Sequence, residues 1–181
     1  MKLNVVVNME QETVKENQQN HPNCLVIGIG NEFRSDDGIG PFIIRKLRRY
    51  KLPAVTLLEM SGEGSALMDA WKDFSRVYIF DAVKSGVQPG TVFRFNALEE
   101  KIPQYFFNYS THNFSLAEAI ELGRVLENLP PYLIVYGIEG ENFGEGKHLS
   151  EKVKKAAGTV IGDFLEGLKK IKSEKNYSFD G

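Results

Sequence analysis

The sequence predicts an α/β fold, a three-layer αβα sandwich with a twisted, mostly parallel sheet of about five strands. Short apolar runs of strand length alternate along the chain with longer amphipathic stretches that have helical spacing. This alternation is typical of a parallel sheet with helices on both faces. We expect one domain at residues 23–172, between a polar leader at 1–22 and a polar tail at 173–181.

The first half of the domain begins with an apolar run that predicts a strand buried on both faces. A helix follows, because Ile39, Ile43 and Leu47 recur on one side of it. The expected elements, in order, are a strand at 25–29, a helix at 38–50, a strand at 55–60, a short helix at 64–74 and a strand at 77–80.

The second half of the domain begins after the turn Gln88-Pro89-Gly90. The link from 77–81 to the next strand is too short for a helical crossover, which allows those two strands to pair antiparallel. Ser150 is the expected N-cap of the last helix. The elements are a strand at 91–95, a helix at 115–129, a strand at 133–138 and a helix at 149–171.

Composition excludes several classes of protein. The formal net charge is -2 at pH 7, which argues against a nucleic-acid binder with its basic field. The single cysteine, Cys24, opens the first strand, so we expect a buried thiol and no internal disulfide. The amino terminus does not have the pattern of a secretory signal, and no apolar run reaches membrane-spanning length. We therefore expect a cytoplasmic protein that binds neither nucleic acid nor a membrane.

Acidic residues follow the predicted strand ends, where sites collect in parallel sheets. In the pair Asp36-Asp37, one carboxylate suffices to cap the following helix, so the other is free to face the crevice. Asp81 follows the apolar run 77–80, where an unpaired carboxylate is costly. It needs a cation, a hydrogen-bond network or a metal.

His112 lies at the entry to an amphipathic helix, whereas His21 and His148 have polar surroundings and are expected on the surface. Two carboxylates and an imidazole suit a borderline divalent ion such as Ni²⁺, Zn²⁺ or Co²⁺. Three protein ligands also leave positions open for water or substrate. Spacing alone does not prove that these residues meet.

Two other functions remain open on the residues alone. A nucleotide-binding module would use Gly28, Gly30 and Glu59, although Phe33 stands where the GxGxxG motif needs its third glycine. A hydrolase with a resident divalent metal would use the same acids and histidine and should retain about one ion per chain.

Four motifs in a fixed order make the chain recognisable from about residue 25 to residue 153. They are the opening GxGN…DDGxG at 28–40, Asp81-Ala82-Val83 with the turn at 88–91, Ser110-Thr111-His112, and Tyr136-Gly137-Ile138-Glu139 followed by 149–153. The chain resembles the hydrogenase maturation proteases, which trim the carboxyl terminus of the [NiFe]-hydrogenase large subunit. It departs from many of them at Gly140, where they have proline, and its leader has no recognised counterpart.

The resemblance implies an endopeptidase whose partner is a [NiFe]-hydrogenase large-subunit precursor. The metal is nickel carried by that substrate, for which zinc or cadmium can substitute in vitro, and its ligands are Asp37, Asp81 and His112. Asp36, Asp37, Asp81 and His112 are the catalytic candidates. Either the nickel polarises the carbonyl or activates a bound water, or Asp36 or Asp37 serves as general base for water.

Overall fold

The computed structural model describes residues 24–103, 106 and 114–176. Within them, one sheet has the strand order β2-β1-β3-β5-β4. β1, β2, β3 and β5 run parallel, and β4 pairs antiparallel with β5 at the edge. The strands are β1 (Cys24–Ile29), β2 (Val55–Met60), β3 (Arg76–Val83), β4 (Val92–Asn96) and β5 (Leu133–Glu139).

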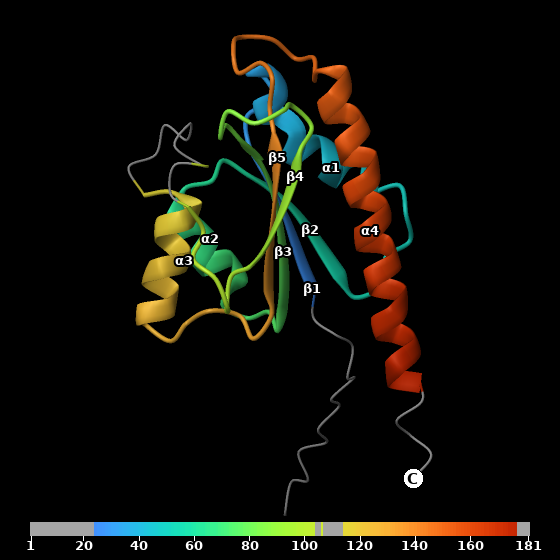
Figure 1. The fold of residues 1–181 in the computed structure, drawn as a ribbon. Coiled ribbons are helices and arrows are strands. Elements are labelled where there is room, and N and C mark those ends of the chain that lie inside the picture. The colour runs from blue at the N-terminus through green and yellow to red at the C-terminus, as the bar shows by residue number, and fades with distance from the viewer. Residues whose placement is uncertain (1–23, 104–105, 107–113, 177–181) are drawn as a thin grey trace, which may run out of the picture.

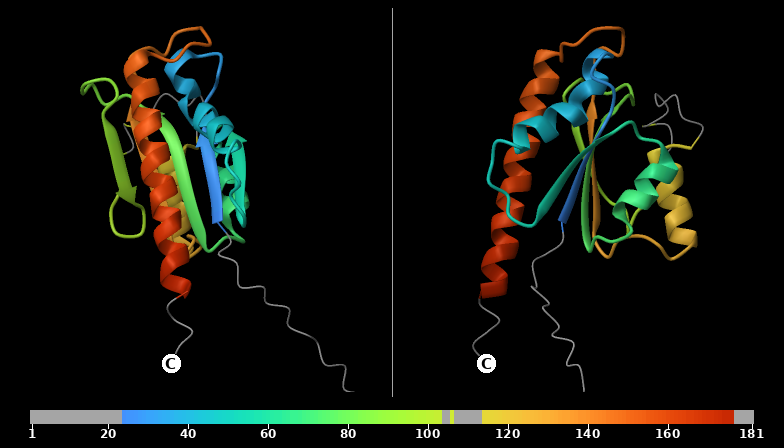
Figure 2. Two further views of the ribbon diagram at one scale, coloured as in Figure 1. Left: turned by 90° about the vertical axis from the view of Figure 1, so that its right-hand side faces the viewer. Right: turned by 180° about the vertical axis from the view of Figure 1, so that it is seen from behind.

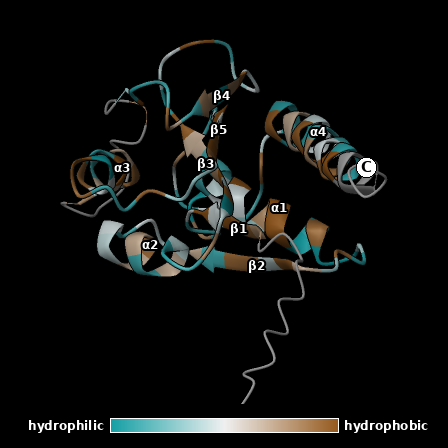
Figure 3. Ribbon diagram, turned by 90° about the horizontal axis from the view of Figure 1, so that it is seen from below, coloured by the Kyte–Doolittle hydropathy of each residue, from teal (hydrophilic) through white to brown (hydrophobic). Residues whose placement is uncertain are grey.

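Helices cover both faces of this sheet, as Figures 1 and 2 show. α1 and α4 pack on one face, and α2 and α3 pack on the other, so the predicted three-layer αβα sandwich is confirmed (Figure 3). A short 3-10 helix, η1, precedes α1. The bounds are η1 (Ser35–Gly38), α1 (Ile39–Leu47), α2 (Gly64–Trp71), α3 (Leu116–Val125) and α4 (Glu151–Asn176).

Alternate side chains of each central strand enter two separate cores, as the period of two in a strand requires. Val26 and Phe80 pack with α1 and α4, whereas Ile27 and Ile79 pack with α2 and α3. This two-sided burial explains why the strands appear in the sequence as continuous apolar runs.

Two glycines bring the start of α1 close to the carboxyl ends of β1 and β3. A Cβ added to Gly40 would lie 2.2 Å from the Ile29 carbonyl oxygen and 2.6 Å from that of Phe80. A Cβ on Gly28 would lie 2.3 Å from the Gly40 carbonyl oxygen. Only glycine fits such contacts, so these residues seat η1 and α1 directly over the edge of the sheet.

Two expectations need correction. β4 is antiparallel, but its partner is β5 and not β3, because β1 and β5 already occupy both edges of β3. Asp81 was expected just past the end of its strand, yet β3 continues to Val83 because it stays paired with β5 up to Glu139. Asp81 therefore lies inside the strand, opposite Gly137.

The expected burial of Cys24 is confirmed. The thiol is free and buried, and its burial raises its pKa to about 12. A thiol that resists ionisation is a poor nucleophile.

Candidate active site

The loops that follow β1, β3 and β5 gather at one end of the molecule, at the top of Figure 1. This is the carboxyl edge of the parallel strands, where ligands of such sheets bind. Gly30 has φ +138°, and a Cβ there would lie 1.8 Å from the Asp37 carbonyl oxygen. The first loop therefore folds tightly back on itself and brings Asp37 over the end of β1.

Asp37 is half-buried in this loop. Its Oδ2 accepts a hydrogen bond of 3.1 Å from the backbone N–H of Asn31. Burial raises the pKa of the Asp37 carboxyl, while the positive charge of Arg34 and the hydrogen bond from Asn31 act in the opposite direction.

Asp81 is buried, with 8% of its surface exposed. Its Oδ1 accepts a hydrogen bond of 2.8 Å from the backbone N–H of Ala82. The pKa of Asp81 is raised well above its usual value, first by burial and then by the negative charge of Asp37. The two acids are therefore close enough to repel each other, and a bound cation would relieve that repulsion.

The metal-free protein should be more stable at neutral pH when Asp81 is replaced by asparagine. A carboxyl whose pKa is raised by folding binds its proton more tightly in the folded state, so stability falls as pH rises above its unfolded pKa. Asp81→Asn removes that ionisation. In EDTA, the variant should melt a few degrees above the wild type near pH 8, and the difference should vanish near pH 4 (about the unfolded pKa of an aspartate). A variant that melts below the wild type at pH 8 would contradict this assignment.

His112 lies outside the described residues, so its convergence with the two acids stays a prediction. Both described flanks reach the same edge of the sheet. The Phe106 carbonyl accepts a hydrogen bond of 3.3 Å from the N–H of Lys84, just after β3, and the Phe114 carbonyl accepts one of 2.9 Å from Gly64, at the start of α2. The described residues alone contain no group of three His, Cys, Asp or Glu side chains arranged to hold a metal.

Neither Asp36 nor Asp37 caps α1, although the sequence had suggested this role for one of the pair. The N-cap of α1 is Gly38, and no side chain makes a capping hydrogen bond there. The carboxylate of Asp36 is fully buried and accepts four hydrogen bonds from the 141–150 loop. The donors are the N–H groups of Glu141 (2.8 Å), Asn142 (2.9 Å) and Ser150 (2.6 Å) and the Ser150 hydroxyl (2.7 Å).

These contacts fix the loop between β5 and α4 to the first loop. Ser150 directly precedes α4, and its carbonyl accepts a hydrogen bond from the N–H of Lys154, as expected of an N-cap residue. Its hydroxyl donates to Asp36. Both oxygens of the Asp36 carboxylate are engaged by donors of this loop.

Glu139 is a third buried acid at this edge, after Asp36 and Asp81, and it was not among the site residues expected from the sequence. It is 1% exposed and closes the loop after β3. Its carboxylate accepts hydrogen bonds from the N–H (2.9 Å) and hydroxyl (2.8 Å) of Ser85 and from the N–H of Gly86 (2.8 Å). The sequence pattern that could have identified it is the one that identified Asp81, namely an acid at the end of a buried apolar run.

Replacing Glu139 with alanine should destabilise the fold by about 2–4 kcal/mol, because donors left without an acceptor cost roughly 1–3 kcal/mol each when buried. Glu141→Ala is the control, since that side chain is 48% exposed and its nearest cation, Lys152, is 3.7 Å away. It should cost less than about 1 kcal/mol. Urea unfolding of both variants measures the difference, and equal losses would show that Glu139 does not hold the loop.

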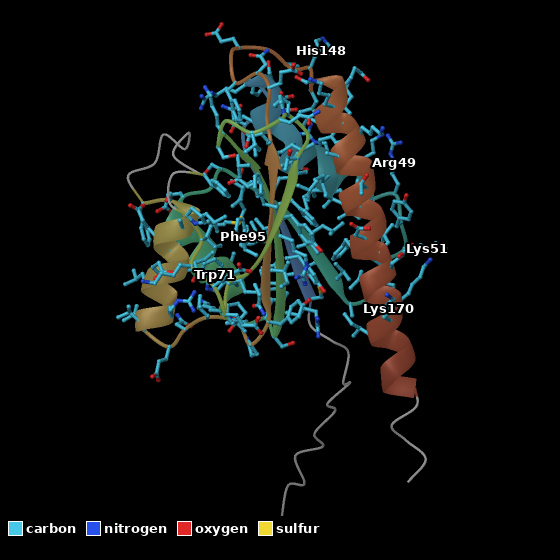
Figure 4. The ribbon with its side chains drawn as sticks, in the orientation of Figure 1. Arg49, Lys51, Trp71, Phe95, His148 and Lys170 are labelled. Carbon is cyan, nitrogen blue, oxygen red and sulfur yellow. The ribbon has the colours of Figure 1, made fainter. Side chains whose placement is uncertain are left out.

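The features that suggested nucleotide binding have structural roles. Glu59 forms ion pairs with Arg45 of α1, at 3.0 Å, and with Arg48, which directly follows α1. Gly28 packs against Gly40 of the same helix. The carboxylate that would hold a ribose is thus already paired, and the glycine is covered by α1. His148 is exposed, as expected, and Figure 4 shows it beyond the amino-terminal end of α4.

The fold and the site define an α/β protein with a pair of neighbouring acids, one buried and one half-buried, at the carboxyl edge of its sheet. Comparison with known proteins gives its family. Residues 41–166 match the family model for hydrogenase maturation proteases. The chain belongs to this family.

Individual relatives agree with this assignment. The chain is 28% identical over 152 residues to the hydrogenase expression/formation protein HupD of Thiocapsa roseopersicina, covering 81% of this chain and 68% of that one. It is 28% identical over 149 residues to the hydrogenase 2 maturation protease of Escherichia coli, covering 80% and 90%. The solution structure of an endopeptidase from Escherichia coli superposes with a TM-score of 0.69 at 25% identity, covering 82% and 93%.

The chain is thus a protease of hydrogenase maturation, and the predicted enzyme class is confirmed. In the part of the chain that the structure describes, no helix is long and apolar enough to cross a membrane.

Proposed function

We propose that this protein is the endopeptidase that removes the carboxyl-terminal extension of a [NiFe]-hydrogenase large-subunit precursor once nickel has been inserted. The observation that carries the proposal is the pair of acids at the carboxyl edge of the sheet, Asp81 buried and Asp37 half-buried, whose negative charges repel each other. Two carboxylates in this state favour a divalent ion as their partner.

The ion is cargo of the substrate in this proposal. Asp37, Asp81 and His112 supply three ligands, and the remaining ligands come from the precursor. His112 completes the set because both described flanks of its segment lie at the edge that carries the acids. An imidazole nitrogen beside two carboxylate oxygens favours nickel over magnesium or calcium.

The reaction adds water across one peptide bond and yields a new carboxylate and a new amine. Asp36 is fully occupied by four donors, so its contacts support a holding role better than that of a general base. We favour the route in which the substrate's nickel, held by Asp37 and Asp81, polarises the scissile carbonyl or activates a bound water.

The test is to mix the purified chain with a nickel-loaded large-subunit precursor and to weigh the products. We expect a shortened large subunit and one released peptide that together account for the precursor plus one water. A cognate, nickel-loaded precursor that keeps its full mass after incubation with this chain would refute the proposed activity. We expect the reaction in the cytoplasm.

A further inference from the structure

An open cavity of about 690 Å³ lies between the loop after β1 and the loop after β5. Its walls are tied together through the backbone. The N–H of Ser35 donates to the Gly146 carbonyl, and the N–H of Gly146 donates to the Phe33 carbonyl, both at 2.9 Å. The lining residues are Phe33, Arg34, Phe143, Gly144, Glu145, Gly146 and Lys147.

Asp36 holds the outer wall of this cavity. This wall consists of residues 143–147. The Asp36 carboxylate accepts hydrogen bonds from both ends of the segment, from Glu141 and Asn142 before it and from Ser150 after it. Three of its five residues are exposed and two are glycines, and only the Phe143 side chain packs partly against the core. The buried carboxylate therefore helps to fix its position, together with the backbone hydrogen bonds of Gly146.

The cavity combines an aromatic surface with positive charge. The Phe33 side chain is 55% exposed, and the Lys147 Nζ lies 4.6 Å from the centroid of its ring. Lys84 Nζ lies 5.8 Å from the centroid of the Phe143 ring. Among the lining residues, the two basic side chains of Arg34 and Lys147 outnumber the one acid, Glu145. An exposed aromatic ring beside cations favours a ligand with an apolar group next to an anion.

The cavity also adjoins the acid pair. Arg34 lines the cavity, and its charge acts on the Asp37 carboxyl. The backbone N–H of Asp37 donates to the Arg34 carbonyl at 3.2 Å. A polypeptide whose metal lies on Asp37 and Asp81 would therefore have its neighbouring residues within reach of Phe33 and Lys147.

We propose that this cavity is a binding subsite for the large-subunit precursor, which places an apolar side chain on Phe33 and an adjacent carboxylate near Lys147, and that Asp36 is the positioning residue that keeps the subsite in shape. The proposal rests on the proposed function and names the surface that recognises the substrate away from the metal.

The test measures both precursor binding, by calorimetry, and cleavage, by steady-state kinetics. Phe33→Ala and Lys147→Gln should each weaken binding and raise KM about tenfold, which is roughly the effect of losing one good contact, and should change kcat less than twofold. The matched controls are Val125→Ala, a side chain 77% exposed on α3, and Lys51→Gln, which Figure 4 shows on the far side of α4 from α3. Both controls should leave Kd, KM and kcat unchanged.

Asp36→Asn should reproduce the Phe33→Ala pattern, with KM raised and kcat largely kept. If Asp36→Asn does not fold, Ser150→Ala, which deletes one of the four hydrogen bonds, should show a smaller rise in the same direction. An unchanged Kd and KM in both Phe33→Ala and Lys147→Gln would overturn the subsite. A kcat loss without a KM change in Asp36→Asn or Ser150→Ala would overturn the positioning role. Failure of the proposed function looks different, because the wild type would then bind the precursor without cutting it.

Discussion

Asp37→Asn and Asp81→Asn should each abolish precursor cleavage, with kcat/KM lower by about 10³-fold or more. In the proposed site each replacement removes a charged oxygen ligand, and the several kcal/mol that a held metal would contribute to the transition state correspond to a loss of this size. The measurement is the mass of the precursor after incubation with each purified variant. Circular dichroism confirms that the variants are folded.

Two further variants sharpen this expectation. Asp37→Glu should retain cleavage, because the resemblance to the family implies that either acid serves at this position. Asp69→Asn removes an aspartate whose side chain is 75% exposed on α2 and should have no effect on cleavage. Wild-type kinetics in either Asp37→Asn or Asp81→Asn would exclude that residue from the site.

His112→Ala should also abolish cleavage and leave the fold intact. Imidazole is the only nitrogen donor in the proposed ligand set, and His112→Gln should fail as well because an amide is a weak neutral ligand. The ring must be neutral to bind a metal, so binding should weaken as pH falls through the pKa of that histidine.

His148→Ala is the matched control for this variant. It removes an exposed histidine that stands near the same end of the sheet (Figure 4). Cleavage should be unchanged. A folded His112→Ala protein that still cuts the precursor at the wild-type rate would leave the acid pair without its nitrogen ligand.

Much of the fold followed from the periodicity of apolar residues. β2 was predicted at residues 55–60, which are its observed bounds, because a strand of mixed burial still shows a clear apolar run between turns. The partner of β4 was not predictable in the same way. Pairing across a sheet depends on which strand edge is free, and a link length constrains direction without choosing the neighbour.

The site residues also fall into those that the sequence predicted and those that it did not. Asp37 and Asp81 were found because acids beside buried strands need an explanation, and the structure brings the two together. The role of Asp36 depends on a loop more than 100 residues away in sequence (its contact with Glu141 spans 105 positions), which no local pattern reveals. Glu139 carried the same signal as Asp81, but its donors lie in a loop 53 and 54 residues earlier.

The most direct measurement compares nickel-loaded and metal-free forms of one large-subunit precursor as substrates. In the proposed function, the chain alone offers three ligands, too few to hold nickel tightly, so we expect recognition to depend on the metal that the precursor carries. Mass spectrometry should show cleavage of the nickel-loaded form only, and loading the metal-free form with nickel should restore cleavage. Equal cleavage of the metal-free form would contradict the claim that Asp37, Asp81 and His112 read the substrate's nickel.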